Sequence, residues 1–281
     1  MNSNFSRIVS YLVMAIVLYF SFSIHSGLGL AAVIVIIGLY IFSKRNAVLL
    51  QRALNESSKG NRKEALLLLE KAYRIDPNNV AIAINYAYLS LKSGEVEKAD
   101  QLLEKAAQQS NSKKFHNNIE MNVALVRWKQ GRLQEGIEIL ERVHSKIKTT
   151  TVYGSLGYLY IEQGDLDQAL SFNMDAYDYN DGDPVIMDNL FLTRILREEW
   201  DEAAVIGAKL LELNPKFPEA SYHHALLLLH HGDLTGALEQ LDTALGRTFT
   251  SVSTESRETV ERKRDEVAKQ LNLTDPSITI A

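Results

Sequence analysis

The sequence contains no cysteine, which excludes disulfide bonds, cysteine-ligated zinc, iron–sulfur clusters and thiol nucleophiles. Only five prolines interrupt its 281 residues, and 46% of the residues are hydrophobic while 23% are charged. This composition rules out disordered and collagen-like chains. Basic charge is also in short supply, because 30 basic and 35 acidic residues give a net charge of −5. Since nucleic acids require a basic surface, DNA and RNA are not expected partners.

Charge of either sign is missing from one N-terminal stretch. Between Ile8 and Ser43 there is no Asp, Glu, Lys or Arg, and only His25-Ser26-Gly27 interrupts the apolar sequence. A membrane-spanning helix needs roughly 20 apolar residues, so the stretch is too long for one upright helix. We predict that residues 1–45 form a membrane anchor, a hairpin of two short transmembrane helices at about 8–24 and 28–42. One long tilted helix is the alternative.

The flanks of this stretch predict its orientation. Arg7 precedes it and Lys44-Arg45 follow it, with more basic residues up to Lys63. Because basic flanks stay on the cytoplasmic side, we expect a multi-pass protein of the cell membrane whose remaining chain faces the cytoplasm. No Gly or Pro lies between Gly38 and Gly60. The second membrane helix is therefore expected to continue directly into the folded part of the chain.

The remainder of the chain is repetitive. A turn position recurs with spacings of 34, 37, 33, 34 and 34 residues. Two further sets of mostly small residues, one residue per repeat, recur with the same spacings. These two columns and the column of turn residues share one register and indicate six repeats. The turn column is Gly60, Gly94, Gly131, Gly164, Glu198 and Gly232, and the other columns are Ala65, Ala99, Gly136, Ala169, Ala203, Ala237 and Ala53, Ala87, Ala124, Gly157, Phe191, Ala225.

Each repeat is predicted to form a helix, a turn and a second helix. In the fourth repeat, Tyr153, Leu156, Gly157 and Tyr160 follow the i, i+3, i+4, i+7 spacing of one helix face. Glycine suits the turn because it tolerates left-handed backbone angles. Small residues suit the places where the two helices cross closely, since a larger side chain would push the axes apart.

These residues resemble the tetratricopeptide repeat family. Its 34-residue pattern matches Tyr153-x2-Leu156-Gly157-x2-Tyr160 followed by Ala169 and Ala176, and the A-x3-F part matches Ala99-x3-Leu103 and Ala237-x3-Leu241. The resemblance implies an all-α fold, a right-handed α-solenoid of about six helix-turn-helix repeats over residues 46–249. Residues 250–281 are predicted to be a capping helix, at about Glu255–Leu271, and a tail; a partner-binding helix is the alternative. The fifth repeat departs from the pattern at Phe191 and Glu198.

No motif predicts catalysis. The sequence has no phosphate-binding loop, no H-E-x-x-H and no G-x-S-x-G. The acidic segment Asp178–Asp183 would place tyrosines at calcium-ligand positions, and His223, His224, His230 and His231 are spaced too widely to chelate one metal. We expect solvated or groove-lining imidazoles there. The chain is therefore predicted to be a non-enzyme without cofactor or metal.

A protein-binding groove is predicted from the helix pattern. In the first helix of each repeat, one stripe of side chains packs between helices. The adjacent stripe lines the concave side of the array, as the family resemblance also implies. The residues of this second stripe are mostly apolar and aromatic, and asparagines recur at a position where family members hold a ligand's backbone. The family's lysine-rich clamp for a terminal carboxylate is not supported, because the matching places are apolar. The predicted partner-binding residues, here called the inner-stripe residues, are Ile84, Asn85, Tyr88, Met121, Asn122, Leu125, Trp128, Tyr158, Asn189 and Tyr222.

Two functions follow from these features. The first is a membrane-anchored scaffold or adaptor that binds apolar helical or extended segments of other proteins in this groove, beside the lipid held by residues 8–42. The alternative is an assembly subunit of a membrane complex, whose main contacts are made by the transmembrane hairpin. In a third arrangement, the groove is filled by neighbouring repeats or by the chain's own tail.

Overall fold

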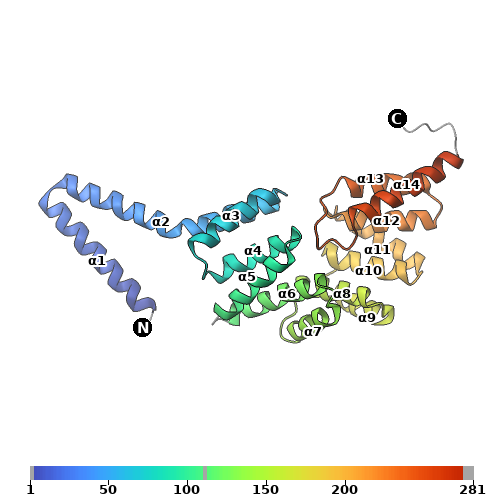
Figure 1. The fold of residues 1–281 in the computed structure, drawn as a ribbon, viewed down its shortest axis with the longest axis horizontal. Coiled ribbons are helices and arrows are strands. Elements are labelled where there is room, and N and C mark those ends of the chain that lie inside the picture. Colours follow the sequence, from blue (N-terminus) through green and yellow to red (C-terminus); the bar gives the residue numbers. More distant parts are fainter. Residues whose placement is uncertain (1–2, 110–112, 275–281) are drawn as a thin grey trace. The chain divides into compact units, whose positions relative to one another are not determined.

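A computed structural model describes residues 3–109 and 113–274, and every regular element in these ranges is a helix (Figure 1). Short polar turns separate the two helices of each repeat, as predicted. Their bounds are α1 (Ser3–Ile24), α2 (Ser26–Ser58), α3 (Arg62–Ile75), α4 (Val80–Lys92), α5 (Val96–Gln109), α6 (Lys113–Lys129), α7 (Leu133–His144), α8 (Thr150–Gln163), α9 (Leu166–Tyr179), α10 (Pro184–Leu196), α11 (Trp200–Glu212), α12 (Pro218–His230), α13 (Leu234–Leu245) and α14 (Arg257–Thr274).

The chain divides into two compact units, residues 1–77 and 78–281. In the first unit, α1 and α2 pack against each other as a helical hairpin that turns at His25. The His25 imidazole Nδ1 accepts a hydrogen bond of 3.0 Å from the amide of Gly27, which caps the start of α2. Gly29 allows the ring of Phe22 to lie close to the α2 backbone, because a Cβ atom at this position would overlap that ring.

Helix α2 runs without a break from the apolar stretch into the first repeat, as expected from the lack of Gly and Pro. Among the residues that the structure describes, no helix carries an apolar stretch long enough to cross a membrane. The two spans predicted at about 8–24 and 28–42 are therefore unsupported by the described residues, and membrane anchoring stays a prediction.

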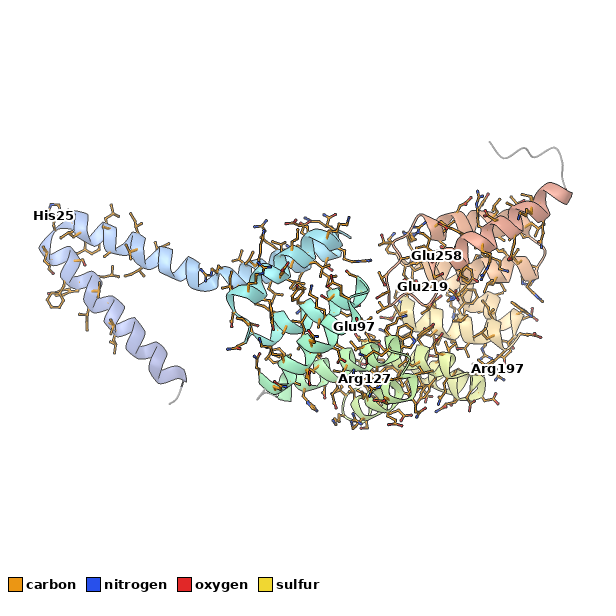
Figure 2. The ribbon with its side chains drawn as sticks, viewed as in Figure 1. His25, Glu97, Arg127, Arg197, Glu219 and Glu258 are labelled. Atoms are coloured by element: carbon orange, nitrogen blue, oxygen red, sulfur yellow. The ribbon has the colours of Figure 1, made fainter. Side chains whose placement is uncertain are left out.

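The repeats form as helix pairs in the predicted register. The C-terminal part of α2 pairs with α3 in the first unit, and the second unit continues with α4–α5, α6–α7, α8–α9, α10–α11 and α12–α13 (Figure 1). Side chains also join successive pairs in the second unit. Arg127 of α6 contacts Asp100 of α5 at 2.7 Å, and Arg197, at the end of α10, contacts Asp167 of α9 (Figure 2).

The predicted columns of small residues lie in the core. Every alanine in them is at most 1% exposed. Gly136 of α7 shows why the residue is small, because a Cβ atom there would lie 2.9 Å from the backbone oxygen of Ala124 in α6. The five turn glycines all have positive φ angles, between 77° and 89°. The prediction of left-handed turns is thus confirmed.

In the fifth repeat the two helices pair in the same way, but the large side chain at their contact comes from the first helix and the small residue from the second. Phe191 of α10 is fully buried where the other repeats have Ala or Gly, and Gly207 of α11 replaces a larger residue opposite it. A Cβ atom on Gly207 would lie 2.8 Å from the Phe191 ring. At the turn, Glu198 adopts a φ of 58°, so a non-glycine residue takes the left-handed conformation here.

Helix α14 covers the last repeat. Val260 and Val267 are at most 2% exposed and share an apolar cluster with Leu241 of α13. Arg264 of α14 contacts Asp242 of α13 at 3.0 Å. Helix α14 therefore packs on the last repeat, and the choice between a capping and a partner-binding role stays a prediction. The predicted tail from Asn272 lies, from residue 275 onward, outside the described residues.

Candidate protein-binding surface

The inner-stripe residues divide into a buried group and an accessible group. Ile84, Tyr158, Asn189 and Tyr222 are only 5–8% exposed. The remaining members, all on α4 and α6, keep more of their surface. Tyr88 is 41% exposed, and Asn85, Met121, Asn122, Leu125 and Trp128 are half-buried. The apolar surface that is free to receive a partner is therefore concentrated on α4 and α6, a smaller area than the sequence predicts.

Aromatic rings and lysines lie together on this accessible part. The ammonium of Lys92 lies 5.5 Å from the ring centre of Tyr88, and that of Lys129 lies 3.5 Å from the ring of Trp128. Burial lowers the pKa of Lys129 below its usual value. The surface thus combines apolar rings with cations held against their faces.

Trp128 and Tyr158 connect the accessible group to the buried group. Their rings meet edge to face with centres 5.3 Å apart, and the Tyr158 hydroxyl donates a hydrogen bond of 2.5 Å to Glu162. Burial, together with this carboxylate, raises the pKa of Tyr158 far above its usual value. Tyr158 is therefore a neutral donor at every physiological pH, fixed by its neighbours before any partner arrives.

The three inner-stripe asparagines already use their amide groups. Asn85 donates to the backbone oxygen of Ala81 and Asn122 to that of Asn118, each within its own helix. Asn189 of α10 donates to the backbone oxygen of Gly154 in α8 at 2.8 Å. Asn189 thus joins two successive repeats, which is a structural role. Ligand binding by these asparagines stays a prediction.

A segment that sequence reasoning missed lies against part of the buried group, because its Phe249 packs in one apolar cluster with Tyr222. Residues 247–256, here called the crossing segment, lead from α13 to α14. The amide of Ser251 donates to the backbone oxygen of Lys92 at 3.2 Å, and the amide of Thr254 donates to the Glu219 carboxylate at 3.0 Å. The crossing segment therefore contacts both α4 and α12. The only signal in the sequence is a run of Ser and Thr between two predicted helices, which does not indicate a docking place.

Beneath the crossing segment lies a buried polar cluster. His223 of α12 is 1% exposed, and its Nδ1 lies 2.9 Å from the carboxylate of Asp188 in α10. Burial lowers the pKa of His223, but the carboxylates of Asp188, Glu219 and Glu255 together outweigh burial and the pKa is raised. The prediction that this imidazole is solvated or lines a groove is wrong, because the side chain closes the contact between two repeats.

In a catalytic triad, a nucleophile would bond to the second imidazole nitrogen of such an Asp–His pair. Among the described residues, the Nε2 atom of His223 has no hydrogen-bond partner. Glu219 lies nearby at the first turn of α12, next to the chain that leads from α13 to α14 (Figure 2). Over the described ranges, no group of three His, Asp or Glu side chains could hold a metal ion.

The described elements, stacked helix pairs with small residues at the crossings, define an all-α helical repeat protein of the solenoid class. Family models described as tetratricopeptide repeat match residues 58–116, 150–181 and 197–249. The chain therefore belongs with the tetratricopeptide repeat proteins, and the resemblance found in the sequence is confirmed. A search of curated proteins gives no match.

Solved structures with the same fold have little sequence in common with this chain. A tetratricopeptide repeat protein from Parabacteroides merdae is 12% identical, with a TM-score of 0.63, over 91% of this chain and 98% of its own. PilF from Pseudomonas aeruginosa is 16% identical, with a TM-score of 0.54, over 79% and 98%. PilW, described as a type IV pilus biogenesis factor, is 14% identical, with a TM-score of 0.56, over 72% and 92%. At these identities the similarity shows the fold alone.

Proposed function

We propose that this chain is a membrane-anchored scaffold that binds apolar helical or extended segments of other proteins on its inner-stripe residues, at the cytoplasmic face of the membrane. The observation that carries the proposal is the accessible apolar surface of α4 and α6, where Tyr88 is 41% exposed and Met121, Leu125 and Trp128 are half-buried. Aromatic side chains grouped in this way are typical anchors of protein interfaces.

The hairpin supports the membrane part of the proposal. No charged residue occurs between Ile8 and Ser43. Large apolar side chains point away from both hairpin helices, including Phe20 at 60% exposed, Ile24 at 74% and Ile34 at 63%. Such a surface is costly in water, and lipid chains would cover it.

Crosslinking followed by pull-down from membranes tests the scaffold. A Tyr88→Asp variant of the full chain should lose the crosslinked partners, because a charge would replace an accessible aromatic anchor. Val205→Asp is the matched control, since Val205 is 58% exposed on the second helix of a repeat and lies outside the inner stripe. Equal recovery of every partner by the Tyr88→Asp variant and the unchanged chain would refute binding at this surface.

A second test addresses the membrane and the side on which the repeats lie. The full chain should stay with membranes through an alkaline wash, and an Ile34→Lys variant should be released more readily, since a charge at mid-helix costs about 2.5–3.5 kcal/mol on insertion scales. Protease added to intact spheroplasts should leave the repeats uncut. Recovery of the unchanged chain in the soluble fraction would contradict anchoring, and cleavage from outside would reverse the orientation.

The assembly-subunit function remains a second candidate, favoured by the extent of exposed apolar side chains on α1 and α2. In that case Ile34→Lys would abolish partner recovery even when the protein is held in detergent, while Tyr88→Asp would leave recovery unchanged. The two variants therefore separate the two functions in one experiment.

A further inference from the structure

The crossing segment bonds to a repeat that is remote from it in the array. The amide of Ser251 donates to the backbone oxygen of Lys92 at 3.2 Å, and the Ser251 hydroxyl donates to the backbone oxygen of Leu91. Both acceptors lie at the end of α4, in the second repeat, whereas Ser251 follows the sixth repeat. Each repeat of a solenoid normally contacts only its neighbours, so stacking of the repeats does not account for this contact.

The two bonds from Ser251 form part of the C-terminal cap of α4. A helix leaves its last carbonyl groups without partners inside the helix. The turn after α4 satisfies earlier carbonyls, for example through the amide of Gly94, which donates to the Leu91 oxygen at 2.9 Å. The Lys92 oxygen is the last one of the helix, and it accepts from the crossing segment.

The residues on both sides of Ser251 are held on the sixth repeat. Phe249 packs in one apolar cluster with Tyr222 of α12, and the guanidinium of Arg257 lies 4.9 Å from the centre of the Phe249 ring. On the other side, the Thr254 amide donates to the Glu219 carboxylate of α12 at 3.0 Å. Ser251 therefore reaches α4 from a turn whose two flanks are fixed.

A contact between the second and sixth repeats acts on all the repeats between them. Successive repeats meet at packed interfaces, such as those of α5 with α6, α7 with α8 and α11 with α12. Small rotations at these interfaces add up along a solenoid and change its curvature. When Ser251 joins α4 to the sixth repeat, rotations at the interfaces between them have to compensate one another.

The accessible part of the inner stripe begins on the same helix. Tyr88 of α4 lies one turn before Leu91 and is 41% exposed with the crossing segment in place. The crossing segment contacts the last turn of α4 and leaves the Tyr88 ring accessible. Its contact therefore positions α4 without occupying the candidate surface.

We propose that the crossing segment fixes the curvature of the repeat array by linking α4 of the second repeat to the sixth repeat through Ser251. With this link closed, the accessible surface of α4 and α6 keeps one position relative to the buried inner-stripe residues of α8, α10 and α12. With the link open, the helices stay folded and the array takes a wider range of curvatures. The inference concerns the chain alone and does not depend on a partner.

Distances between spin labels test this inference in the full chain, held in detergent. The chain contains no cysteine, so Gln101→Cys on α5 and Glu239→Cys on α13, both at exposed positions, introduce two defined labelling sites. Glu239→Cys with Lys269→Cys on α14 is the matched control pair. Both labels of the control pair lie on the sixth-repeat side of the link.

Ser251→Pro opens the link, because proline has neither an amide hydrogen nor a hydroxyl group. Ser251 is the second residue of a turn that the Ser253 amide closes on the Thr250 oxygen at 3.0 Å. Proline is favoured at this position, so the turn itself is kept. The α5–α13 distance distribution should become roughly twofold broader, because independent rotations at the four interfaces between the second and sixth repeats then add as a square root.

The variants and the control pair decide the outcome. Ser251→Ala should give an intermediate width, since it keeps the amide bond to Lys92, and the α13–α14 distribution should not change. Equal α5–α13 distributions in the unchanged chain and in Ser251→Pro, at unchanged helical circular dichroism, would overturn the inference. Broadening of the α13–α14 pair as well would also overturn it, because the substitution would then have loosened the last repeat.

Hydrogen exchange gives a second measurement that does not rely on proline. In Ser251→Ala, protection of the amide of residue 251 should fall by about tenfold because one of its two bonds to α4 is lost; tenfold corresponds to about 1.4 kcal/mol. Protection of the Thr254 amide should stay the same, because its acceptor Glu219 lies on the sixth repeat. An unprotected Ser251 amide in the unchanged chain would refute a persistent link.

Discussion

The fifth and sixth repeats build the same helix pair from opposite side chains. In the sixth, the small Ala225 of α12 lies in one apolar cluster with the large Leu241 of α13. In the fifth, the large Phe191 of α10 faces the small Gly207 of α11. Both pairs are separated by 16 residues in the sequence. The repeat therefore requires the combined volume of the two residues to be conserved, and either helix can supply the larger side chain.

The largest expected effect on stability comes from changing the volume of Phe191 or of Gly207. Phe191→Ala should lower the free energy of unfolding by about 3–5 kcal/mol because it leaves a cavity in the core. Gly207→Leu should cost about 3 kcal/mol, because even its Cβ would lie 2.8 Å from the Phe191 ring. The double variant should recover most of both losses, since it restores the arrangement of the sixth repeat.

Chemical denaturation of the full chain in detergent, arranged as a double-mutant cycle, measures this coupling. Ala225→Phe with Leu241→Gly is the reciprocal control in the sixth repeat. If the two fifth-repeat losses simply add, the volume argument does not hold.

A smaller effect on stability is expected in the fourth repeat, where the larger residue at the same helix contact is polar. Gly157 of α8 faces Asn173 of α9, whose amide donates to the Gly157 oxygen at 3.3 Å and to Thr193 at 3.1 Å. Gly157→Ala should cost about 2 kcal/mol, because its Cβ would overlap the Asn173 amide. Gly246→Ala is the control, since its φ of −71° and its surroundings accept a methyl group. A thermal melt of both variants compares them; similar transition temperatures would contradict the prediction.

The polar link between the fifth and sixth repeats should make stability depend on pH. The pKa of His223 is raised by the carboxylates of Asp188, Glu219 and Glu255 in spite of burial, so its contribution is full below the usual pKa of about 6.5 and is lost as the pH rises through the raised value. The raised pKa values of Glu219 and Glu255 act in the same direction from lower pH. The free energy of unfolding should therefore fall with rising pH, by at most about 1.4 kcal/mol per pH unit for each proton.

Denaturation between pH 5.5 and 8 checks this, because an Asp188→Asn/His223→Gln variant should show a flatter profile above pH 6.5. A profile unchanged by the double substitution would exclude His223 as the source.

The smallest effect concerns the turns of these two repeats. Glu198 holds a φ of 58° where the sixth repeat has Gly232. Glu198→Gly should raise the free energy of unfolding by about 1 kcal/mol, because glycine has no Cβ to clash in the left-handed conformation. Gly232→Ala, at a φ of 78°, should lower it by a similar amount. Denaturation midpoints that do not move in opposite directions would refute this account.

The fold could be predicted because its signals are local or periodic. The regular spacing of glycines such as Gly60 and Gly164 predicted the turns. The same spacing of alanines such as Ala65 and Ala169 predicted where the helices of a repeat cross closely. The compensation of Phe191 by Gly207 could have been found by comparing positions 16 residues apart. By contrast, no spacing rule connects Ser251 with Leu91, since they are 160 residues apart.

The candidate surface was predicted only in outline for the same reason. Tyr88 and Leu125 lie where the stripe pattern placed them and keep accessible surface, but Tyr158 and Tyr222 are covered. A stripe pattern shows which side chains point inward from a helix. It does not show which of them the chain itself encloses.

The linear sequence alone determined the helix pairs, their register and the apolar N-terminal stretch, because each depends on neighbours within about 34 residues that recur in order. Tertiary structure decided which inner side chains are open, how His223 is paired and where residues 247–256 lie. These features arise when helices far apart in the chain come together, because only that packing determines which side chains are buried and which charges lie near one another.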